Sequence, residues 1–196
     1  MGISTAPDEF HAVMQQLLGD LPFVRVYLDD VLVLSSSFDE HLQHLKVVLQ
    51  RLQDAGVVVY PAKSKFCMTE VEYLGYRITR EGKEPVRKKR DAILNLARPR
   101  NIRDLRRFIG MVNYYKDMWR NRSELLAPLT ALTSSKKAYR WTSVEQNAFE
   151  KIKERIAAQV QLQYPDFGLP FELYTDASAH QLGGVIMQRG KPLAFW

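Results

Sequence analysis

Apolar residues recur along this chain with two different periods, and the periods predict where helices and strands lie. A helical period over residues 6–18, and again from Ser37 to about Ala55, predicts two amphipathic helices. Ser37 and Glu40 form a capping-box pattern before the second helix, and Gly56 is a typical stop after it. These two segments therefore have both the periodicity and the boundary signals of helices.

Short apolar runs predict the strands that accompany these helices. Phe23–Val26 and Val31–Leu34 flank an acidic pair and predict a tight hairpin. Val57–Tyr60 predicts a further strand, and Glu72–Ile78 predicts one or two more. The order helix, hairpin, helix, strand, hairpin suits an antiparallel sheet that is backed by helices on one face.

The composition changes at Glu81–Pro85, and the pattern beyond this point becomes helical. Pro128 marks or kinks the third of the helices expected there. Thr142 and Glu145 form a second capping-box pattern, which predicts another helix to about Ala158. The helices that periodicity predicts before this one cover about residues 86–97, 102–118 and 123–133.

The last part of the chain returns to strand-like patterns. Tyr164–Gly168 predicts a loop, and Phe171–Tyr174 and Gly184–Gln188 predict a strand pair. Leu193–Trp196 is a strand-like apolar end. Because natural chain ends are usually solvated and poorly ordered, we expect the sequence to be a piece of a larger protein.

Composition places the chain among ordinary globular proteins, with one charged block. The 196 residues are 46% hydrophobic and 26% charged, which is typical of one or two soluble domains. The single cysteine, Cys67, excludes an internal disulfide, and no apolar run reaches the length of a membrane span. His41 and His44 lie three residues apart on an expected helix, as surface residues or as a chelating pair.

The net charge of +6 is concentrated between Arg77 and Arg107, where twelve Lys or Arg stand against four Asp or Glu. A basic block of this kind indicates a polyanionic partner, with nucleic acid as the leading candidate. The alternative is a solvated helical face without a partner.

The tetrapeptide Tyr27-Leu28-Asp29-Asp30 occupies the turn of the first expected hairpin. Two adjacent carboxylates at a hairpin tip repel each other and are stabilised by a divalent, oxygen-preferring cation such as Mg²⁺. Asp is also a common turn residue, so the pair alone leaves a plain turn as the alternative.

Residues 102–115, placed on a helix, divide into an apolar and a basic face. Gly110 lies within the basic face, although a glycine inside a helix costs about 0.8–1 kcal/mol relative to alanine. Among arginines, it would let a nucleic-acid backbone approach closely; a helix–helix contact is the alternative. The apolar face comprises Leu105, Phe108, Ile109, Val112 and Tyr115, and the other comprises Arg103, Arg106, Arg107, Gly110 and Tyr114, with Asn113 at its margin.

In their order, these motifs resemble the reverse transcriptase and ribonuclease H region of the pol polyprotein of gypsy-type long-terminal-repeat retrotransposons. The resemblance runs over essentially the whole chain. The matching motifs are residues 1–10 (under the templating base and incoming nucleotide), Tyr27–Asp30 (polymerase metal motif), Tyr60–Phe66 (lysine-bearing motif near the triphosphate), Glu72–Tyr76 (primer grip), Asn101–Tyr115 (thumb helix along the minor groove), and Tyr164–Phe167 with Tyr174–Ser178 (entry into ribonuclease H and its first catalytic aspartate).

The resemblance implies which residues act in the intact protein. Asp29 would be a direct ligand of one of two Mg²⁺ (or Mn²⁺) ions, and Asp30 a ligand or a support. Asp176 would be the first metal-binding carboxylate of ribonuclease H, whereas without the family it is a lone Asp at a strand end. The residues near the nucleoside triphosphate would be Gly2, Pro7, Phe10, Tyr27 and Lys63. The residues that hold the primer–template would be Leu74, Gly75, Tyr76, Arg103, Arg106, Arg107, Gly110, Asn113 and Tyr114.

Departures from the family pattern bear on activity. The polymerase site also needs a carboxylate upstream of residue 1, and ribonuclease H needs carboxylates beyond residue 196. We therefore expect this piece alone to lack both activities and to bind Mg²⁺ weakly. Tyr60 stands where the family commonly has a small polar residue. Ala62 stands where a second lysine is frequent, so Lys63 is the better triphosphate ligand and Lys65 the weaker one.

The expected fold class is α+β in four parts. Residues 1–84 would be the C-terminal half of a polymerase palm, 85–138 a helical thumb, 139–166 a tether, and 167–196 the first strands of a ribonuclease-H-like α/β domain. The expected function is that of an RNA-directed DNA polymerase with linked ribonuclease H. Its partners would be an RNA/DNA primer–template, deoxynucleoside triphosphates and the remainder of the pol polyprotein, with no membrane. The alternatives are a non-catalytic nucleic-acid-binding remnant of the element and a reading frame without function.

Overall fold

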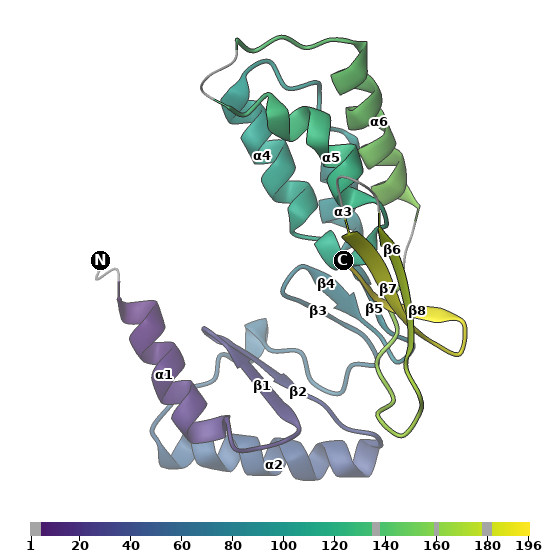
Figure 1. The fold of residues 1–196 in the computed structure, drawn as a ribbon. Coiled ribbons are helices and arrows are strands. Elements are labelled where there is room, and N and C mark those ends of the chain that lie inside the picture. Colours follow the sequence, from purple (N-terminus) through teal and green to yellow (C-terminus); the bar gives the residue numbers. More distant parts are fainter. Residues whose placement is uncertain (1–4, 135–137, 159–160, 178–181) are drawn as a thin grey trace. The chain divides into compact units, whose positions relative to one another are not determined.

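The computed structural model describes residues 5–134, 138–158, 161–177 and 182–196 of the chain. The chain divides into two compact units, residues 1–69 and 70–196, and Figure 1 shows the helices and strands of each. Both units mix helices with antiparallel strands, which confirms the expected α+β fold class. None of the helices within the described ranges is both long and apolar enough to cross a membrane.

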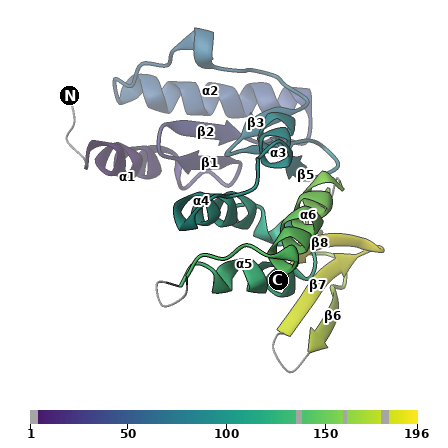
Figure 2. The same cartoon turned by 90° about the horizontal axis from the view of Figure 1, so that it is seen from above.

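In the first unit, two helices pack against a β-hairpin. Both α1 and α2 contact this hairpin, and Figure 2 shows the helices beside β1 and β2. Their bounds are α1 Ala6–Leu18, β1 Val24–Tyr27, β2 Asp30–Val33 and α2 Phe38–Asp54. The buried core of the unit consists of Met14, Leu18, Leu21, Val24, Val48 and Leu52. The helices and the hairpin expected here are confirmed.

Half of the capping box expected at the start of α2 is present, namely the N-cap bond of Ser37. The Ser37 hydroxyl accepts a hydrogen bond from the Glu40 backbone N–H at 3.2 Å. The Glu40 carboxylate accepts the backbone N–H of Ser36 in return, one residue before the N-cap. One of the N–H groups that the helix start leaves without a partner, that of Glu40, is therefore satisfied by the N-cap side chain, and the Glu40 carboxylate binds the chain just before the helix.

The strand expected at Val57–Tyr60 was wrong. Val57 and Val59 pack against the core of the first unit, while Val58 and Tyr60 are 92% and 63% exposed. The segment therefore has the alternating burial of a strand, but among the described residues no strand pairs with it. It leads directly into a short 3-10 helix at Pro61–Lys63.

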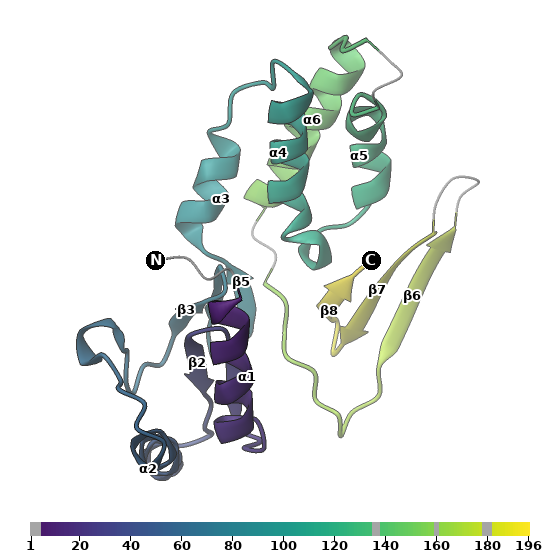
Figure 3. The ribbon, with the colours of Figure 1, turned by 90° about the vertical axis from the view of Figure 1, so that its left-hand side faces the viewer.

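The described residues of the second unit form two three-stranded antiparallel sheets and four α-helices. The first sheet has the order β3 (Val71–Tyr73), β4 (Tyr76–Ile78), β5 (Lys83–Pro85), and the second has the order β6 (Glu172–Ala177), β7 (Leu182–Gln188), β8 (Lys191–Phe195). The helices are α3 (Arg87–Leu94), α4 (Ile102–Asn113), α5 (Arg122–Ala131) and α6 (Ser143–Ala157), with a 3-10 turn at Lys116–Met118. Figure 3 shows the helices as a bundle next to the second sheet.

Several boundaries in this unit differ from those expected. The helix expected to run to residue 118 ends at Asn113, because the Tyr114 and Tyr115 side chains turn to the β3–β4 loop described below. The third helix, expected over about residues 123–133, is found at Arg122–Ala131 with Pro128 inside it. β5 was not expected, since its sequence Lys-Glu-Pro has no apolar pattern to indicate a strand.

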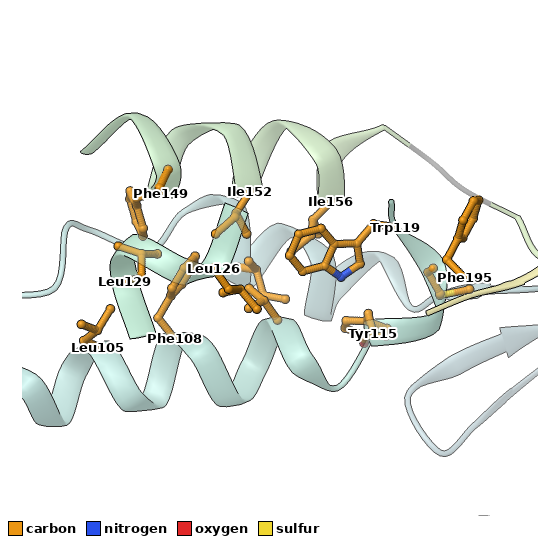
Figure 4. Close-up of a cluster of buried hydrophobic side chains, with 14 of the residues drawn as sticks. Leu105, Phe108, Tyr115, Trp119, Leu126, Leu129, Phe149, Ile152, Ile156 and Phe195 are labelled. Atoms are coloured by element: carbon orange, nitrogen blue, oxygen red, sulfur yellow. The ribbon is translucent and has the colours of Figure 1, made fainter. Parts of the chain in front are cut away.

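The core of the second unit lies between α4, α5 and α6. Leu105, Phe108 and Val112 of α4 are fully buried, as the helical period predicted. Figure 4 shows side chains of the three helices pointing toward one another, with Phe195 of β8 at one end. The ring centroids of Phe108 and Phe149 lie 4.7 Å apart, and the rings are tilted, an arrangement that aromatic pairs prefer.

The segment before the second sheet is attached to the first one. Lys83 of β5 and Leu162 exchange two backbone hydrogen bonds, with N···O distances of 2.9 and 3.0 Å. Gly82 has φ +150°, and a Cβ atom on it would lie 2.1 Å from the Leu162 carbonyl oxygen. Glycine is therefore required for this close approach of two backbones.

Three tyrosines attach the β3–β4 turn to the end of α4. The Tyr114 hydroxyl donates to the Leu74 carbonyl, and the Tyr115 hydroxyl donates to the Gly75 carbonyl at 3.1 Å. The Tyr76 hydroxyl donates to the Tyr114 carbonyl at 3.0 Å. Each ring also lies within 5.7 Å of another. We call these three residues the tyrosine cluster.

We expect Leu129→Ala to destabilise the second unit by about 2–5 kcal/mol, because it removes a fully buried side chain from the core. Urea unfolding followed by tryptophan fluorescence measures this, since Trp119, Trp141 and Trp196 all lie in the second unit. The matched control is the exposed Thr130→Ala on the same helix, with an expected change within about 0.5 kcal/mol. Equal changes in the two variants would contradict the assigned core.

The tyrosine cluster predicts a late ionisation. Burial, with the neighbouring Tyr114 adding to it, raises the pKa of Tyr76 and Tyr115 from 10.0 to about 12. The folded state favours the neutral phenols, so their contribution to stability is intact below pH 10 and is lost as the pH rises through about 12. Phenolate absorbance should show one late-titrating tyrosine fewer in Tyr115→Phe, but not in the exposed control Tyr60→Phe. A single transition near the ordinary tyrosine pKa would contradict this.

Candidate active-site hairpin and nucleic-acid face

Both carboxylates of the acidic pair lie at the tip of the β1–β2 hairpin. Tyr27 pairs with Asp30 as the last residue pair of the ladder, so Leu28 and Asp29 form a two-residue turn. Leu28 has φ +52°, whereas Asp29 keeps a negative φ. A positive φ at only the first central residue is the pattern of a type II′ turn, which normally has glycine there.

The electrostatics of this tip favour a cation. Asp29 and Asp30 are both exposed, and within the described ranges neither forms an ion pair or a side-chain hydrogen bond. Carboxylate oxygens are the ligands that Mg²⁺ prefers. No group of three or more His, Cys, Asp or Glu side chains that suits a metal is found in the described part of the chain. Among the described residues the tip therefore offers two oxygen donors, which are too few for a complete metal site.

The residues expected near a nucleotide are placed as follows. Pro7 and Phe10 are exposed on α1, and Tyr27 is 50% exposed at the end of β1. Gly2 lies outside the described residues. Lys63 is exposed on the 3-10 helix, with its ammonium 5.7 Å from the centre of the Tyr60 ring. Tyr60, which the sequence left unexplained, thus provides an aromatic surface for Lys63.

The expected primer grip is a tight turn between β3 and β4. Leu74 and Gly75 have φ +46° and +75°, so both central residues are in the left-handed region, as in a type I′ turn. A Cβ atom on Gly75 would lie 2.7 Å from Lys89 Nζ and 3.1 Å from the Tyr114 ring. The turn is therefore packed closely against α3 and the tyrosine cluster.

The basic side of α4 is exposed, as the sequence predicted. Arg103, Arg107, Gly110 and Asn113 all face solvent in the described structure. Among the described residues, a Cβ atom on Gly110 would have nothing within 4 Å, so no helix–helix contact found there explains this glycine. Glycine destabilises the helix relative to alanine, and among the described residues no close packing at Gly110 compensates for this.

Two members of this face have partners that the sequence did not indicate. The Arg106 guanidinium donates to the Thr133 carbonyl at the end of α5, at 3.0 Å. Tyr114 is 47% exposed, but its hydroxyl is bonded to Leu74 in the β3–β4 turn. Each bond joins this face to a residue outside α4, so a helical wheel of α4 does not show it.

Asp176 lies in β6, opposite Gly183 of β7. All six residues of β6 are exposed, including Asp176. In the described structure the carboxylate is therefore accessible and has no ion pair. Residues 178–181, which follow β6, lie outside the described residues.

One contact at the hairpin tip was missed at the sequence level. The Leu28 backbone N–H donates to His11 Nδ1 of α1, at 3.1 Å. Periodicity placed His11 on an expected helix and gave it no role. No sequence signal indicates a side-chain bond to a backbone group 17 residues away.

Two family profiles match most of this chain. Residues 1–78 match the family of reverse transcriptase (RNA-dependent DNA polymerase), which includes the hairpin and the β3–β4 strands. Residues 141–196 match the RNase H-like domain found in reverse transcriptase, which includes Asp176.

Curated relatives include the transposon Tf2-3 and Tf2-7 polyproteins of Schizosaccharomyces pombe. They are 35% and 34% identical to this chain over 190 residues, which is 96% of the chain. The chain spans only 14% of the length of these relatives.

Solved structures of similar fold include the foamy viral protease-reverse transcriptase. In its complex with double-stranded DNA, a form designated dRH matches 97% of this chain with a TM-score of 0.87 and 29% identity, over 34% of its own length. In its complex with an RNA/DNA hybrid, it matches 97% of this chain with a TM-score of 0.82 and 30% identity, over 26% of its own length.

The hairpin with its acidic pair, the order of the motifs around it, the two family profiles and the transposon relatives agree. This chain belongs to the reverse transcriptase and ribonuclease H region of gypsy-type retrotransposon polyproteins.

Proposed function

We propose that this chain is the part of an RNA-directed DNA polymerase that carries its metal-binding hairpin, primer grip and thumb, followed by the start of a linked ribonuclease H. The observation that carries the proposal is the hairpin tip, where two exposed carboxylates have no ion-pair partner in the described structure. The reaction proposed for the intact protein is templated addition of deoxynucleotides to a primer. The same division assigns residues 1–84 to the palm, 85–138 to the thumb, 139–166 to the tether and 167–196 to ribonuclease H.

Reverse transcriptases and their ribonucleases H generally use divalent metal ions. Asp29 and Asp30 fit such an ion because they are exposed oxygen donors at one tip, and Mg²⁺ or Mn²⁺ is the proposed ion. The chemistry supplied by bound ions is a lower pKa of the primer 3′-hydroxyl and neutralisation of the leaving pyrophosphate. Asp29 is the proposed direct ligand and Asp30 a ligand or a support. Asp176 is the proposed carboxylate of the ribonuclease H site.

Residues of the first unit hold the incoming nucleotide in this proposal. The Lys63 ammonium stabilises charge on the triphosphate, and its position over the Tyr60 ring limits the directions it takes. Tyr27 lines the active site from the end of β1. Gly2, Pro7 and Phe10 belong to the segment that lies under the templating base and the nucleotide.

Residues of the second unit hold the nucleic acid. Leu74, Gly75 and Tyr76 position the primer end, and the tyrosine cluster fixes their turn against α4. Arg103, Arg107 and Asn113 contact phosphates and sugars, with Gly110 providing clearance for the backbone. Arg106 adds positive charge to this face while it is anchored to α5. Tyr114 contributes its exposed ring edge.

A non-catalytic nucleic-acid-binding protein is the second candidate function. It is favoured by one observation: the exposed basic face of α4 and the β3–β4 turn lie within one unit of this chain. The isolated chain therefore retains a duplex-binding surface even where no catalysis takes place.

For the polymerase, we expect Asp29→Asn to lower primer extension by about a thousandfold or more in a longer protein that includes the upstream half of the palm. The loss of one metal-binding carboxylate would then correspond to about 4 kcal/mol of transition-state stabilisation. Extension of a labelled primer on an RNA template, with Mg²⁺, measures this. The control is Asp39→Asn on α2, an exposed carboxylate away from the tip, which should keep full activity. Extension that survives Asp29→Asn would refute the metal site.

For the thumb, we expect the isolated chain to bind an RNA/DNA hybrid with an affinity that falls as salt rises, because phosphate contacts release counterions. Gly110→Leu should weaken this binding by at least about tenfold, since it blocks the approach of the backbone without a change in charge. Fluorescence anisotropy of a labelled hybrid measures the affinity, and circular dichroism checks the fold.

Two control variants separate shape from charge in this experiment. Asn147→Leu adds the same side chain at an exposed position of α6, and Arg122→Ala removes a charge at the start of α5. Both should bind within about threefold of the wild type. Equal losses in Gly110→Leu and Asn147→Leu would mean that α4 is only a generic basic surface.

A further inference from the structure

We propose that His11 is a positioning residue that holds the turn carrying Asp29 in its conformation. The inference rests on the proposed function in one respect, namely that Asp29 is a metal ligand. Its structural basis is the hydrogen bond from the Leu28 backbone N–H to His11 Nδ1, at 3.1 Å. The donor belongs to the residue immediately before Asp29, so the bond holds the Tyr27–Leu28 peptide at one side of Leu28, whose φ sets the path of the chain into Asp29.

The first step of the argument is the orientation of the backbone groups of β1. In an antiparallel pair, hydrogen-bonded residue pairs alternate with pairs whose N–H and C=O groups point away from the partner. Leu34 N–H donates to the Phe23 carbonyl. Phe23 and every second residue after it therefore direct their backbone groups toward β2. The alternate positions are Val24, Val26 and Leu28. Their backbone groups therefore face the other edge of β1.

The groups on this other edge are satisfied one after another. Val24 N–H donates to the Leu21 carbonyl at 3.0 Å. The Val26 carbonyl accepts from Gln15 Nε2 at 3.4 Å, and Leu28 N–H donates to His11. His11 and Gln15 are one helical turn apart on α1 and so lie on the same face. α1 thus follows the edge of β1 with two side chains, spaced to match alternate residues of the strand.

The helix that carries His11 is itself fixed in place. Met14 and Leu18, on the same helix, are 3% and 0% exposed in the core of the first unit. α1 contacts β1, and the two elements lie next to each other in Figure 2. The acceptor nitrogen is therefore presented from a packed helix and not from a loop.

The turn needs such support, because its conformation is unfavourable for its sequence. Leu28 has φ +52° at a turn position where glycine is the usual residue. A non-glycine residue in the left-handed region persists only where its surroundings determine it. The hydrogen bond to His11 ties the Leu28 amide to α1, which is the support that the hairpin itself does not provide.

The geometry also assigns the tautomer of His11. A backbone N–H is always a donor, so the nitrogen that it meets must carry a lone pair. His11 Nδ1 is therefore unprotonated, and the ring hydrogen lies on Nε2. Within the described ranges His11 belongs to no group of three or more metal-binding side chains, so metal coordination does not account for this arrangement.

A first experiment reads the tautomer in the unmodified chain by ¹⁵N nuclear magnetic resonance of the imidazoles. We expect Nδ1 of His11 to have the chemical shift of an unprotonated, hydrogen-bonded nitrogen, and Nε2 that of a protonated one. A hydrogen on Nδ1 would overturn the proposal, because that nitrogen could not accept from Leu28. This measurement needs no variant and decides the matter even where a substitution unfolds the protein.

A second experiment measures hydrogen exchange of the Leu28 amide in variants. His11→Leu removes the acceptor and should speed exchange by roughly tenfold. His11→Gln restores an acceptor oxygen and should bring exchange back to within about threefold of the wild type. The control Gln15→Leu removes the neighbouring bond to Val26 and should leave Leu28 unchanged. Equal exchange in His11→Leu and the wild type, with the fold intact by circular dichroism, would overturn the proposal.

Mn²⁺ separates this inference from the proposed function. Added to the wild-type chain, Mn²⁺ should broaden the amide signals of Asp29 and Asp30, and absence of that broadening would count against the metal site itself. In His11→Leu the same broadening should need a severalfold higher Mn²⁺ concentration, and His11→Gln should restore it. Where the wild type does broaden, an unchanged Mn²⁺ response in His11→Leu would overturn the positioning role. Where it does not, the metal site fails and the exchange of the Leu28 amide alone decides the positioning role.

Discussion

The second unit depends on one constraint, which is that α4 must bury one side completely and leave the other free. Leu105, Phe108 and Val112 are at most 2% exposed, and they bring α5 and α6 together. The end of the same helix carries Tyr114 and Tyr115, which bind the β3–β4 turn. Because one rigid element makes both sets of contacts, the β3–β4 turn and the exposed basic face keep a fixed relation to each other.

In the first unit, the strained acidic turn of the β1–β2 hairpin is held in one conformation. The β1–β2 ladder satisfies the backbone groups on one edge of β1 only. On the other edge, side chains of α1 bind the backbone at Val26 and Leu28. The carboxylates themselves remain exposed, which keeps them available to a ligand. Support for the turn therefore comes from the backbone side and does not occupy the carboxylate oxygens of Asp29 and Asp30.

Much of this fold follows from local sequence signals. Helical periods and capping residues predicted α1, α2 and α6 to within a residue or two, because those signals act within a few residues of one another. The acidic turn and the exposed side of α4 were likewise predictable. The resemblance of the motifs to a polymerase family was confirmed by the family profiles.

Features that depend on distant partners were not predictable. Val57–Tyr60 has the pattern of a strand, but pairing requires a neighbour, which no local pattern reports. β5 lacks apolar alternation and exists because β4 and Leu162 supply its hydrogen bonds. Arg106, Tyr114 and His11 bond to carbonyl or amide groups 27, 40 and 17 residues away. A helical wheel shows which way such side chains point, but not what they meet.

The open space above Gly110 has a consequence for how this sequence changes over generations. No described residue lies against the glycine, and alanine would strengthen the helix by about 0.8–1 kcal/mol. Mutational drift limited only by folding would therefore tend to replace it. Under the proposed function, a glycine retained here reflects contact with nucleic acid. In a copy of the element that no longer binds nucleic acid, Gly110 would then be among the first positions of α4 to be lost.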